Sequence, residues 1–112
     1  MLPGQYSIRG MDETLKKRVI HETAKKYNIE IDKIILFGSR ARGDYREDSD
    51  WDILVVTRGK LDNRTKISFW HEVYRKIDLP ADIIVVSRET FEKFKGDYGF
   101  VYRYALEEGI TV

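Results

Sequence analysis

The sequence predicts an α/β domain, because short apolar runs typical of strands alternate with longer stretches that have helical spacing. Residues 34–37, 53–56 and 83–86 are uninterrupted apolar runs. They suit buried strands and are far shorter than the roughly 20 residues that cross a bilayer. The 112-residue chain is long enough for one compact domain, whereas half that length would not enclose a core of its own.

Composition excludes several classes of protein. The chain carries 20 Lys and Arg against 19 Asp and Glu, so bulk charge gives no sign of nucleic-acid binding. It has no cysteine, which excludes disulfides and thiolate chemistry, and with only His21 and His71 a zinc site is disfavoured. Residues 1–10 have no apolar core of signal-peptide length. We therefore expect a cytoplasmic protein with no membrane association.

The first helix is expected over residues 12–27. Pro and Gly interrupt residues 1–10, which are predicted to be a flexible N-terminal extension before a single domain of residues 11–112. Acidic residues at the start of the predicted helix and lysines near its end complement the helix dipole. The apolar positions that fit one helical face are Leu15, Val19, Ile20 and Ala24.

Two strands are expected next, joined by a charged segment. Residues 34–37 read as a buried strand that ends in a turn at Gly38 and Ser39. Residues 40–49 are too polar for the core, and they lead into a second strand over residues 51–56.

A second helix is predicted within residues 61–77, and a third strand at 81–86 follows Pro80. Ser87 is expected to cap a short helix, with further helix at 98–108 and an edge strand at 110–112. The helical stripe of residues 61–77 comprises Ile67, Trp70, Val73, Tyr74 and Ile77, and the aromatic residues assigned to the core are Phe69, Trp70, Tyr74, Phe91 and Phe94. The aromatic cluster Tyr98, Phe100, Tyr102 and Tyr104 fits either core packing or a partner-binding patch.

Three aspartates stand at the starts of the apolar strands. Asp50 and Asp52 are two apart, so their side chains leave the same face with Cα atoms roughly 6.6 Å apart, while Trp51 points the other way. Asp82 joins them if the third strand lies beside the second. Such crowded carboxylates stay ionised at neutral pH only when cations neutralise them, and an all-oxygen site suits Mg²⁺.

A turn that can bind phosphate precedes these carboxylates. Its sequence is Gly38-Ser39-Arg40-Ala41-Arg42-Gly43. After a strand, such a turn offers backbone N–H groups to an anion, and Gly38 lets the phosphate come close. The segment is not the P-loop of nucleotide triphosphatases, because Asp44 and Tyr45 stand where Lys and Ser or Thr are required.

A phosphate turn, two strand carboxylates about ten residues later and a third on another strand are what two-metal nucleotidyl transfer needs. Gly38 to Gly43, Ser49-Asp50-Trp51-Asp52 and Asp82 resemble the minimal nucleotidyltransferase (MNT) family of the DNA polymerase beta superfamily. The resemblance extends from Met11 over nearly the whole chain. A departure is Trp51, where a smaller aliphatic residue is common, and we expect it to change packing rather than chemistry.

The resemblance implies an α/β (α+β) fold with a small mixed sheet flanked by helices. It also implies two Mg²⁺ ions, ATP as the nucleotide and transfer of AMP to a hydroxyl. In the implied roles, Gly38 and Ser39 bind the triphosphate, Arg42 assists, and three carboxylates hold the metals. Those carboxylates are Asp50, Asp52 and Asp82, of which Asp82 lies nearest the attacking hydroxyl. The implied acceptor is a tyrosine of a HEPN-type partner in a toxin–antitoxin module.

Other interpretations stay open. The aspartates could be ordinary residues of turns and strand starts, and Arg40 and Arg42 could be exposed without a role. The chain could also be a binding module that neutralises its partner by masking it, with weak or absent catalysis. Both homo- and hetero-oligomers are compatible with the sequence.

Overall fold

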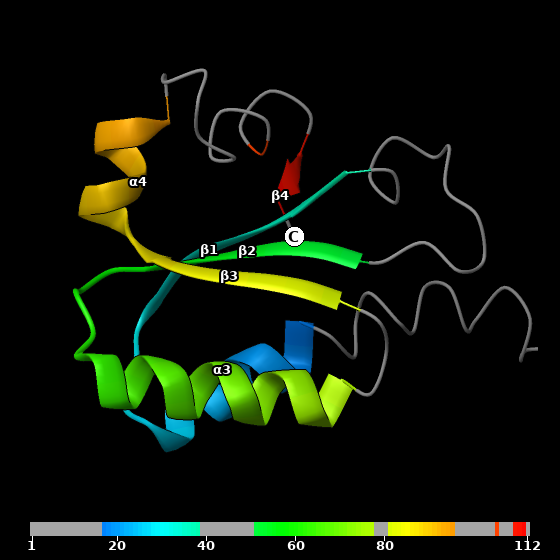
Figure 1. Ribbon diagram of the computed structural model, residues 1–112, viewed down its shortest axis with the longest axis vertical. Coiled ribbons are helices and arrows are strands. Elements are labelled where there is room, and N and C mark those ends of the chain that lie inside the picture. The colour runs from blue at the N-terminus through cyan, green and yellow to red at the C-terminus, as the bar shows by residue number, and fades with distance from the viewer. Residues whose placement is uncertain (1–16, 39–50, 78–80, 96–104, 106–108, 112) are drawn as a thin grey trace, which may run out of the picture.

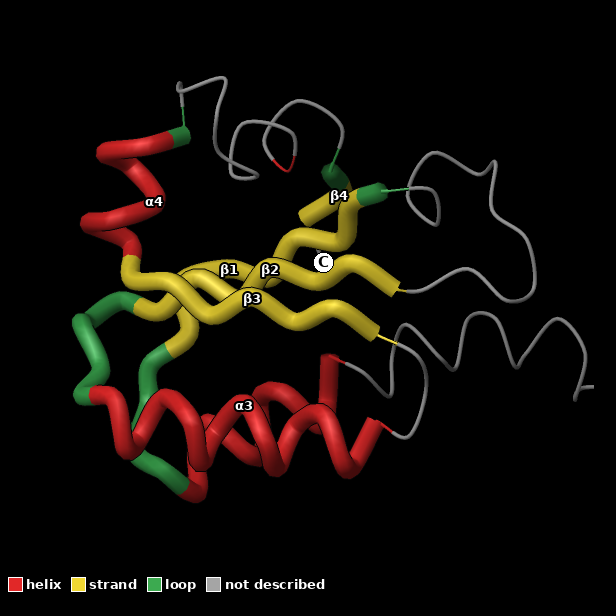
Figure 2. The backbone as a smooth tube through the Cα atoms, in the orientation of Figure 1, coloured by secondary structure: helices red, strands yellow, loops and turns green. Residues whose placement is uncertain are grey.

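A four-stranded mixed sheet organises the part of the chain that the computed structural model describes, residues 17–38, 51–77, 81–95, 105 and 109–111. The strand order is β3-β2-β1-β4. β2 pairs parallel with β3, whereas β1 pairs antiparallel with both β2 and β4 (Figure 2). The strands are β1 (Ile31–Phe37), β2 (Trp51–Thr57), β3 (Ala81–Ser87) and β4 (Ile110–Thr111). The implied mixed sheet flanked by helices is confirmed.

The strand boundaries differ slightly from those predicted. β1 begins three residues before the apolar run, because Ile31 and Lys33 also pair with β2, across a register shift at Asp32. β2 and β3 each extend one residue further, to Thr57 and Ser87. The predicted edge strand near the C-terminus is present as β4.

Helices cover both faces of the sheet, as continuous apolar strands require. The helical segment 17–26 and α3 (Asn63–Ile77) lie on one face, and α4 (Arg88–Phe94) lies on the other (Figure 1). The sheet therefore separates two cores. The first contains Ile20, Ala24, Ile29, Ile34, Leu36, Trp51, Ile53, Val55, Phe69, Val73, Ala81, Ile83 and Val85. The second contains Ile35, Phe37, Leu54, Val56, Val86, Phe91 and Ala105.

The buried face of α3 is the predicted one only in part, since Phe69, Val73 and the partly buried Ile77 pack in the core as expected. Phe69 and Val73, four residues apart, are fully buried, whereas Trp70 and Tyr74 are 36% and 43% exposed. The assignment of Trp70 and Tyr74 to the core was therefore wrong. The helix has apolar residues on two neighbouring faces, and the face with Phe69 packs against the sheet. The helix starts at Asn63 because Asp62 Oδ1 accepts a hydrogen bond from the Thr65 amide at 2.8 Å.

A buried carboxylate ties the helical segment 17–26 to α3. Glu72 accepts hydrogen bonds from Lys26 Nζ and Tyr27 Oη, both at 2.9 Å, and its other oxygen lies 2.8 Å from Lys76 Nζ. Hydrogen bonds from Lys76, Lys26 and Tyr27 hold the pKa of Glu72 at about 2. Glu72 therefore stays ionised against the core, in the manner of a structural ion cluster.

Ser87 caps α4, as predicted, because its Oγ accepts a hydrogen bond from the Thr90 amide at 3.2 Å. Phe91 is fully buried, which confirms its core assignment, and Phe94 is half-buried. Within the described residues, no helix is both long and apolar enough to cross a membrane. The predicted N-terminal extension at 1–10 and the cluster of Tyr98, Phe100, Tyr102 and Tyr104 lie outside the described residues.

Candidate active site

Asp52 and Asp82 lie side by side at the starts of two parallel strands. The β2–β3 register pairs them directly, and neighbouring strands are about 4.8 Å apart. Alternation along β2 directs Asp52 to the face of Leu54, while Trp51 is buried in the core on the opposite face. The predicted meeting of Asp52 with Asp82 is confirmed, as is the opposite orientation of Trp51.

Gly38 brings the end of β1 against the same carboxylate. Phe37 pairs with Asp52 across β1 and β2, and the next residue, Gly38, has φ +78°. A Cβ built on Gly38 would overlap Asp52 Oδ2, so both the backbone conformation and the space require glycine. The sequence predicted that Gly38 admits a phosphate. Its contact with Asp52 depends on the antiparallel register, which the motif does not reveal.

An open pocket of about 480 Å³ surrounds the two aspartates, within the range of small-molecule sites. Trp70 and Tyr74 of α3 stack with ring centroids 5.3 Å apart and an interplanar angle of 18°. Trp70 Nε1 also donates a hydrogen bond to the Ile83 carbonyl at 2.8 Å, which fixes the indole beside β3. Sequence reasoning missed both aromatic residues as site residues. The lining residues are Phe37, Asp52, Trp70, Tyr74, Ala81, Asp82, Ile83 and Ile84.

The donor set fits a hard divalent cation. Among the described lining residues, the charged groups are the carboxylates of Asp52 and Asp82. Two such groups side by side repel each other unless a cation neutralises them, and oxygen ligands suit Mg²⁺. No cluster of three or more His, Cys, Asp or Glu occurs within the described ranges. The third predicted carboxylate, Asp50, and the predicted nucleotide contacts Ser39 and Arg42 fall outside those ranges.

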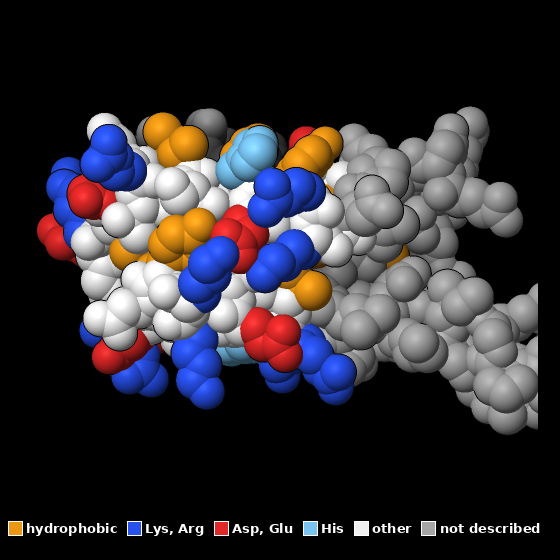
Figure 3. Space-filling view, turned by 90° about the horizontal axis from the view of Figure 1, so that it is seen from below, with side chains coloured by type: hydrophobic (Ala, Val, Ile, Leu, Met, Phe, Trp, Pro, Cys, Tyr) orange, Lys and Arg blue, Asp and Glu red, His pale blue; other side chains and the backbone are white. Residues whose placement is uncertain are grey.

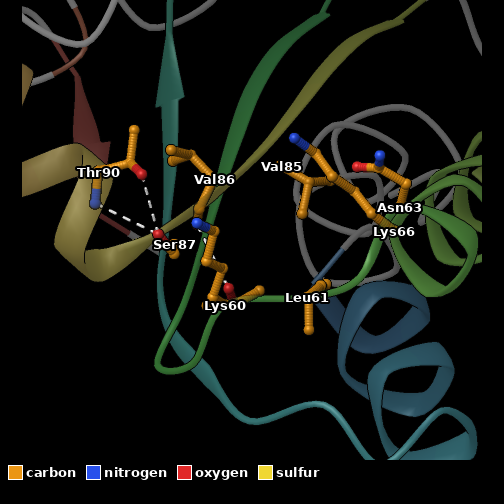
Figure 4. A pocket seen from close by; sticks show the side chains of 9 residues that line it. Lys60, Leu61, Asn63, Lys66, Val85, Val86, Ser87 and Thr90 are labelled. Carbon is orange, nitrogen blue, oxygen red and sulfur yellow. Dashed lines mark hydrogen bonds between the residues drawn. The ribbon is translucent and has the colours of Figure 1, made fainter.

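The opposite end of the sheet has a smaller pocket of about 180 Å³ with a different character. Thr57 Oγ1 donates to the Gly59 carbonyl at 2.7 Å. Ser87 Oγ donates to Thr90 Oγ1 at 3.1 Å (Figure 4). None of the residues that line this pocket is acidic. Carboxylate chemistry in the described residues therefore concentrates at the end with Asp52 and Asp82.

Comparison with known sequences agrees with this geometry. Residues 18–97 match the model of the family described as "Polymerase beta, Nucleotidyltransferase". The chain is also similar to a "Putative protein adenylyltransferase" of Methanocaldococcus jannaschii, with 42% identity over 98 residues. The aligned region is 88% of this chain and 94% of that relative.

Solved structures share the fold. A nucleotidyltransferase from Sulfolobus solfataricus, described as putative, aligns with a TM-score of 0.58 and 27% identity, covering 99% of this chain and 89% of that one. A toxin–antitoxin structure with AMP-PNP aligns at 0.58 with 19% identity and coverage of 84% and 69%. A tri-AMPylated Shewanella oneidensis HEPN toxin in complex with MNT antitoxin aligns at 0.55 with 17% identity and coverage of 88% and 69%.

Proposed function

The chain belongs to the polymerase beta nucleotidyltransferase family, and from that membership we propose that it transfers AMP from ATP to a tyrosine of a HEPN-type partner protein. In this reaction the tyrosine oxygen forms a bond to the α-phosphorus. The bond from that phosphorus to the pyrophosphate oxygen breaks, and the tyrosine gives up its proton. The partner would be the toxin of a toxin–antitoxin module, inactivated by the attached nucleotide.

The alignment of Asp52 with Asp82 beside Gly38 carries this proposal. These two carboxylates would hold Mg²⁺ together with Asp50. When bound, the metal neutralises phosphate charge and lowers the pKa of an attacking hydroxyl. Gly38, which has no side chain, would let the triphosphate approach the backbone, where Ser39 and Arg42 would add donors. Asp82 lies on the terminal strand of the described sheet, so an acceptor can approach it from outside the sheet.

Relatives support the choice of nucleotide and acceptor. The Methanocaldococcus jannaschii relative is described as a protein adenylyltransferase, which points to AMP and to a protein acceptor. Among proteins of the same fold, one toxin–antitoxin structure contains AMP-PNP and another contains a tri-AMPylated HEPN toxin with its MNT antitoxin. A HEPN protein is therefore the acceptor to test first.

The test is labelled-nucleotide transfer. Purified chain, Mg²⁺, ATP labelled at the α-phosphate and a HEPN-type protein are incubated, and the labelled residue is located by mass spectrometry. We expect one AMP adduct on a HEPN tyrosine and its loss in Asp52→Asn. Asp32→Asn is the matched control, because Asp32 lies near the opposite end of β1 and pairs with Arg88 at 3.5 Å.

The masking alternative predicts a different result. A module that only covers its partner would leave the HEPN protein unlabelled, and Asp52→Asn would still neutralise it fully. That combination would exclude the proposed reaction. Label on a serine or threonine would correct the acceptor, whereas equal labelling by Asp52→Asn would remove the carboxylate from the chemistry.

A further inference from the structure

An apolar stripe runs along the exposed side of α3. Ile67 is 64% exposed, Trp70 36% and Tyr74 43%, and these are the large apolar side chains left exposed among the described residues. Their positions i, i+3 and i+7 form one ridge along two helical turns, about 10 Å long. Ridges with this spacing pack against a second helix. Aromatic residues such as Trp and Tyr are also frequent anchors of protein interfaces.

This stripe is continuous with the candidate active site. An open groove of about 400 Å³ lies between the stripe and β3, and Ile67 and Lys66 are among its lining residues. The groove shares Trp70, Ile83 and Ile84 with the pocket around Asp52 and Asp82. A protein that packs on the stripe would therefore lie beside the carboxylates.

The edge of β3 is already partly closed. β3 is the terminal strand of the described sheet, but its Ile83 carbonyl already accepts a hydrogen bond from Trp70 Nε1 at 2.8 Å. An added strand would have to share or displace that hydrogen bond. The geometry therefore favours a helix on the stripe over a strand on the edge.

The charge around the stripe selects an acidic partner. The exposed charged side chains of α3 are all basic, namely those of Arg64, Lys66, Arg75 and Lys76. Glu72, the single acidic residue of this fully described helix, is buried between Lys26 and Lys76. On the face formed by α3 and segment 17–26, Lys and Arg side chains are spread among apolar patches and a smaller number of acidic side chains (Figure 3). Such a surface attracts negative charge and sets the orientation of a partner.

We propose that α3 docks an acidic amphipathic helix of the protein that receives the nucleotide. The apolar side of that helix covers Ile67, Trp70 and Tyr74, and its acidic residues face Lys66 and Arg64. This proposal rests on the proposed function, and it adds the surface that recognises the acceptor. Docking there holds the acceptor protein next to Asp82 while leaving the turn after Gly38 to the nucleotide.

The test compares binding with transfer for the HEPN-type protein that serves as acceptor in the transfer experiment. Ile67→Glu places a charge on the ridge, and we expect its Kd for the HEPN protein to rise at least tenfold. Lys66→Glu reverses a flanking charge, and it should weaken binding and reduce its dependence on NaCl. The matched controls are Lys93→Gln for the first and Lys93→Glu for the second, because Lys93 is exposed on α4, which lies on the opposite face of the sheet. Both controls should bind as the wild type does.

Separate readouts distinguish this proposal from the proposed function. Ile67→Glu should raise KM for the HEPN protein while the thermal stabilisation by Mg²⁺ and ATP stays at the wild-type value. Unchanged affinity of Ile67→Glu would overturn the docking surface even if transfer is observed. Transfer that is absent from the wild type while the affinity still depends on Ile67 would overturn only the reaction.

Two further outcomes would show that something other than a helix of the acceptor protein packs on the stripe. A dimer of this chain that Ile67→Glu dissociates, measured by sedimentation equilibrium, would show that a second copy covers the stripe. Tighter HEPN binding by Trp70→Phe, which frees the Ile83 carbonyl, would indicate an added strand. Either result would overturn the helix-docking proposal.

Discussion

Polar side chains are arranged differently at the two ends of the sheet. At the end where β2 and β3 begin, Asp52 and Asp82 lie side by side in an open pocket, and Asp82 is exposed. At the end where they finish, the Thr57 hydroxyl is buried and donates to the Gly59 carbonyl, and Ser87 caps α4. One end collects like charges, while the other satisfies polar groups within the chain.

The finishing end is also tied by ion pairs. Arg88 lies 3.5 Å from Asp32, and Arg58 lies 3.7 Å from Glu30 while its amide donates to the Glu30 carbonyl at 2.9 Å. These contacts join β1 to the segments that follow β2 and β3. Complementary pairs of this kind stabilise the fold by themselves, whereas two aligned carboxylates form a set of oxygen ligands that suits a cation. The comparison therefore separates an end whose described contacts serve the fold from an end whose carboxylates suit the proposed ligand.

Asp82→Asn should give the largest effect, because it removes one of the aligned charges. We expect the rate of AMP transfer to fall about 100-fold or more, as when an electrostatic group is lost from an active site. Mg²⁺ with ATP at 100 times its Kd stabilises a protein by about 2.7 kcal/mol, and most of this should disappear in the variant. Differential scanning fluorimetry with and without Mg²⁺ and ATP measures the loss.

The same change at the finishing end provides the contrast. Asp32→Asn should leave both transfer and ligand stabilisation at wild-type values, since its partner Arg88 is a surface contact. Without metal, Asp82→Asn should melt at or above the wild-type temperature, because it relieves repulsion with Asp52. A lower metal-free melting temperature would identify Asp82 as a structural residue and break the comparison between the two ends.

Gly38→Ala should give the next largest effect. A residue other than glycine at φ +78° costs about 1–3 kcal/mol, and its Cβ would displace the Asp52 carboxylate. We expect lower stability in urea together with a loss of transfer. Gly59→Ala is the matched control, because no atom lies within 4 Å of the Cβ it would add. Equal stability of the two variants would contradict the requirement for glycine at position 38.

Much of the starting end could be predicted from the sequence, because its signals are local. Asp52 and Asp82 stand out because each begins a run that is otherwise apolar, and Gly38 directly follows an apolar run and so indicates a turn. The pairing of Asp52 with Asp82 needed the additional assumption that β2 and β3 are neighbours. That assumption is confirmed by the parallel register.

The pocket wall formed by Trp70 and Tyr74 could not be predicted, because α3 has apolar residues on two of its faces. Periodicity placed Ile67, Trp70 and Tyr74 on one stripe with Val73, and it could not show that the helix turns Val73 and Phe69 inward and leaves the other three exposed. On the inner side of α3, Glu72 accepts hydrogen bonds from Lys26 and Tyr27, which come from the region of segment 17–26. A long-range ion cluster of this kind has no sequence signature, and so the exposed aromatic residues were assigned to the core.

Glu72 is a buried carboxylate held by hydrogen bonds and ion pairs from Lys26, Tyr27 and Lys76. Its folded pKa of about 2 lies below the ordinary value of 4.5, so its contribution to folding is present above about pH 4.5 and is lost as the pH falls towards 2. Glu72→Gln should therefore weaken the fold at pH 7 and flatten the decline in urea stability between pH 4.5 and 2. Glu89→Gln, exposed on α4, should retain the wild-type pH profile.

Ser87→Ala tests the finishing end with the smallest expected effect. It removes the N-cap of α4, whose Oγ accepts from the Thr90 amide, and N-cap losses cost about 0.5–2 kcal/mol. Because Ser87 lies at the opposite end of β3 from Asp82, the unfolding midpoint in urea should fall while the rate of AMP transfer at 25 °C stays at the wild-type value. Ser87→Thr keeps an acceptor oxygen and should restore most of the stability. A fall in transfer under conditions where Ser87→Ala remains folded would show that the two ends of β3 are coupled, and the division between a structural end and a catalytic end would then fail.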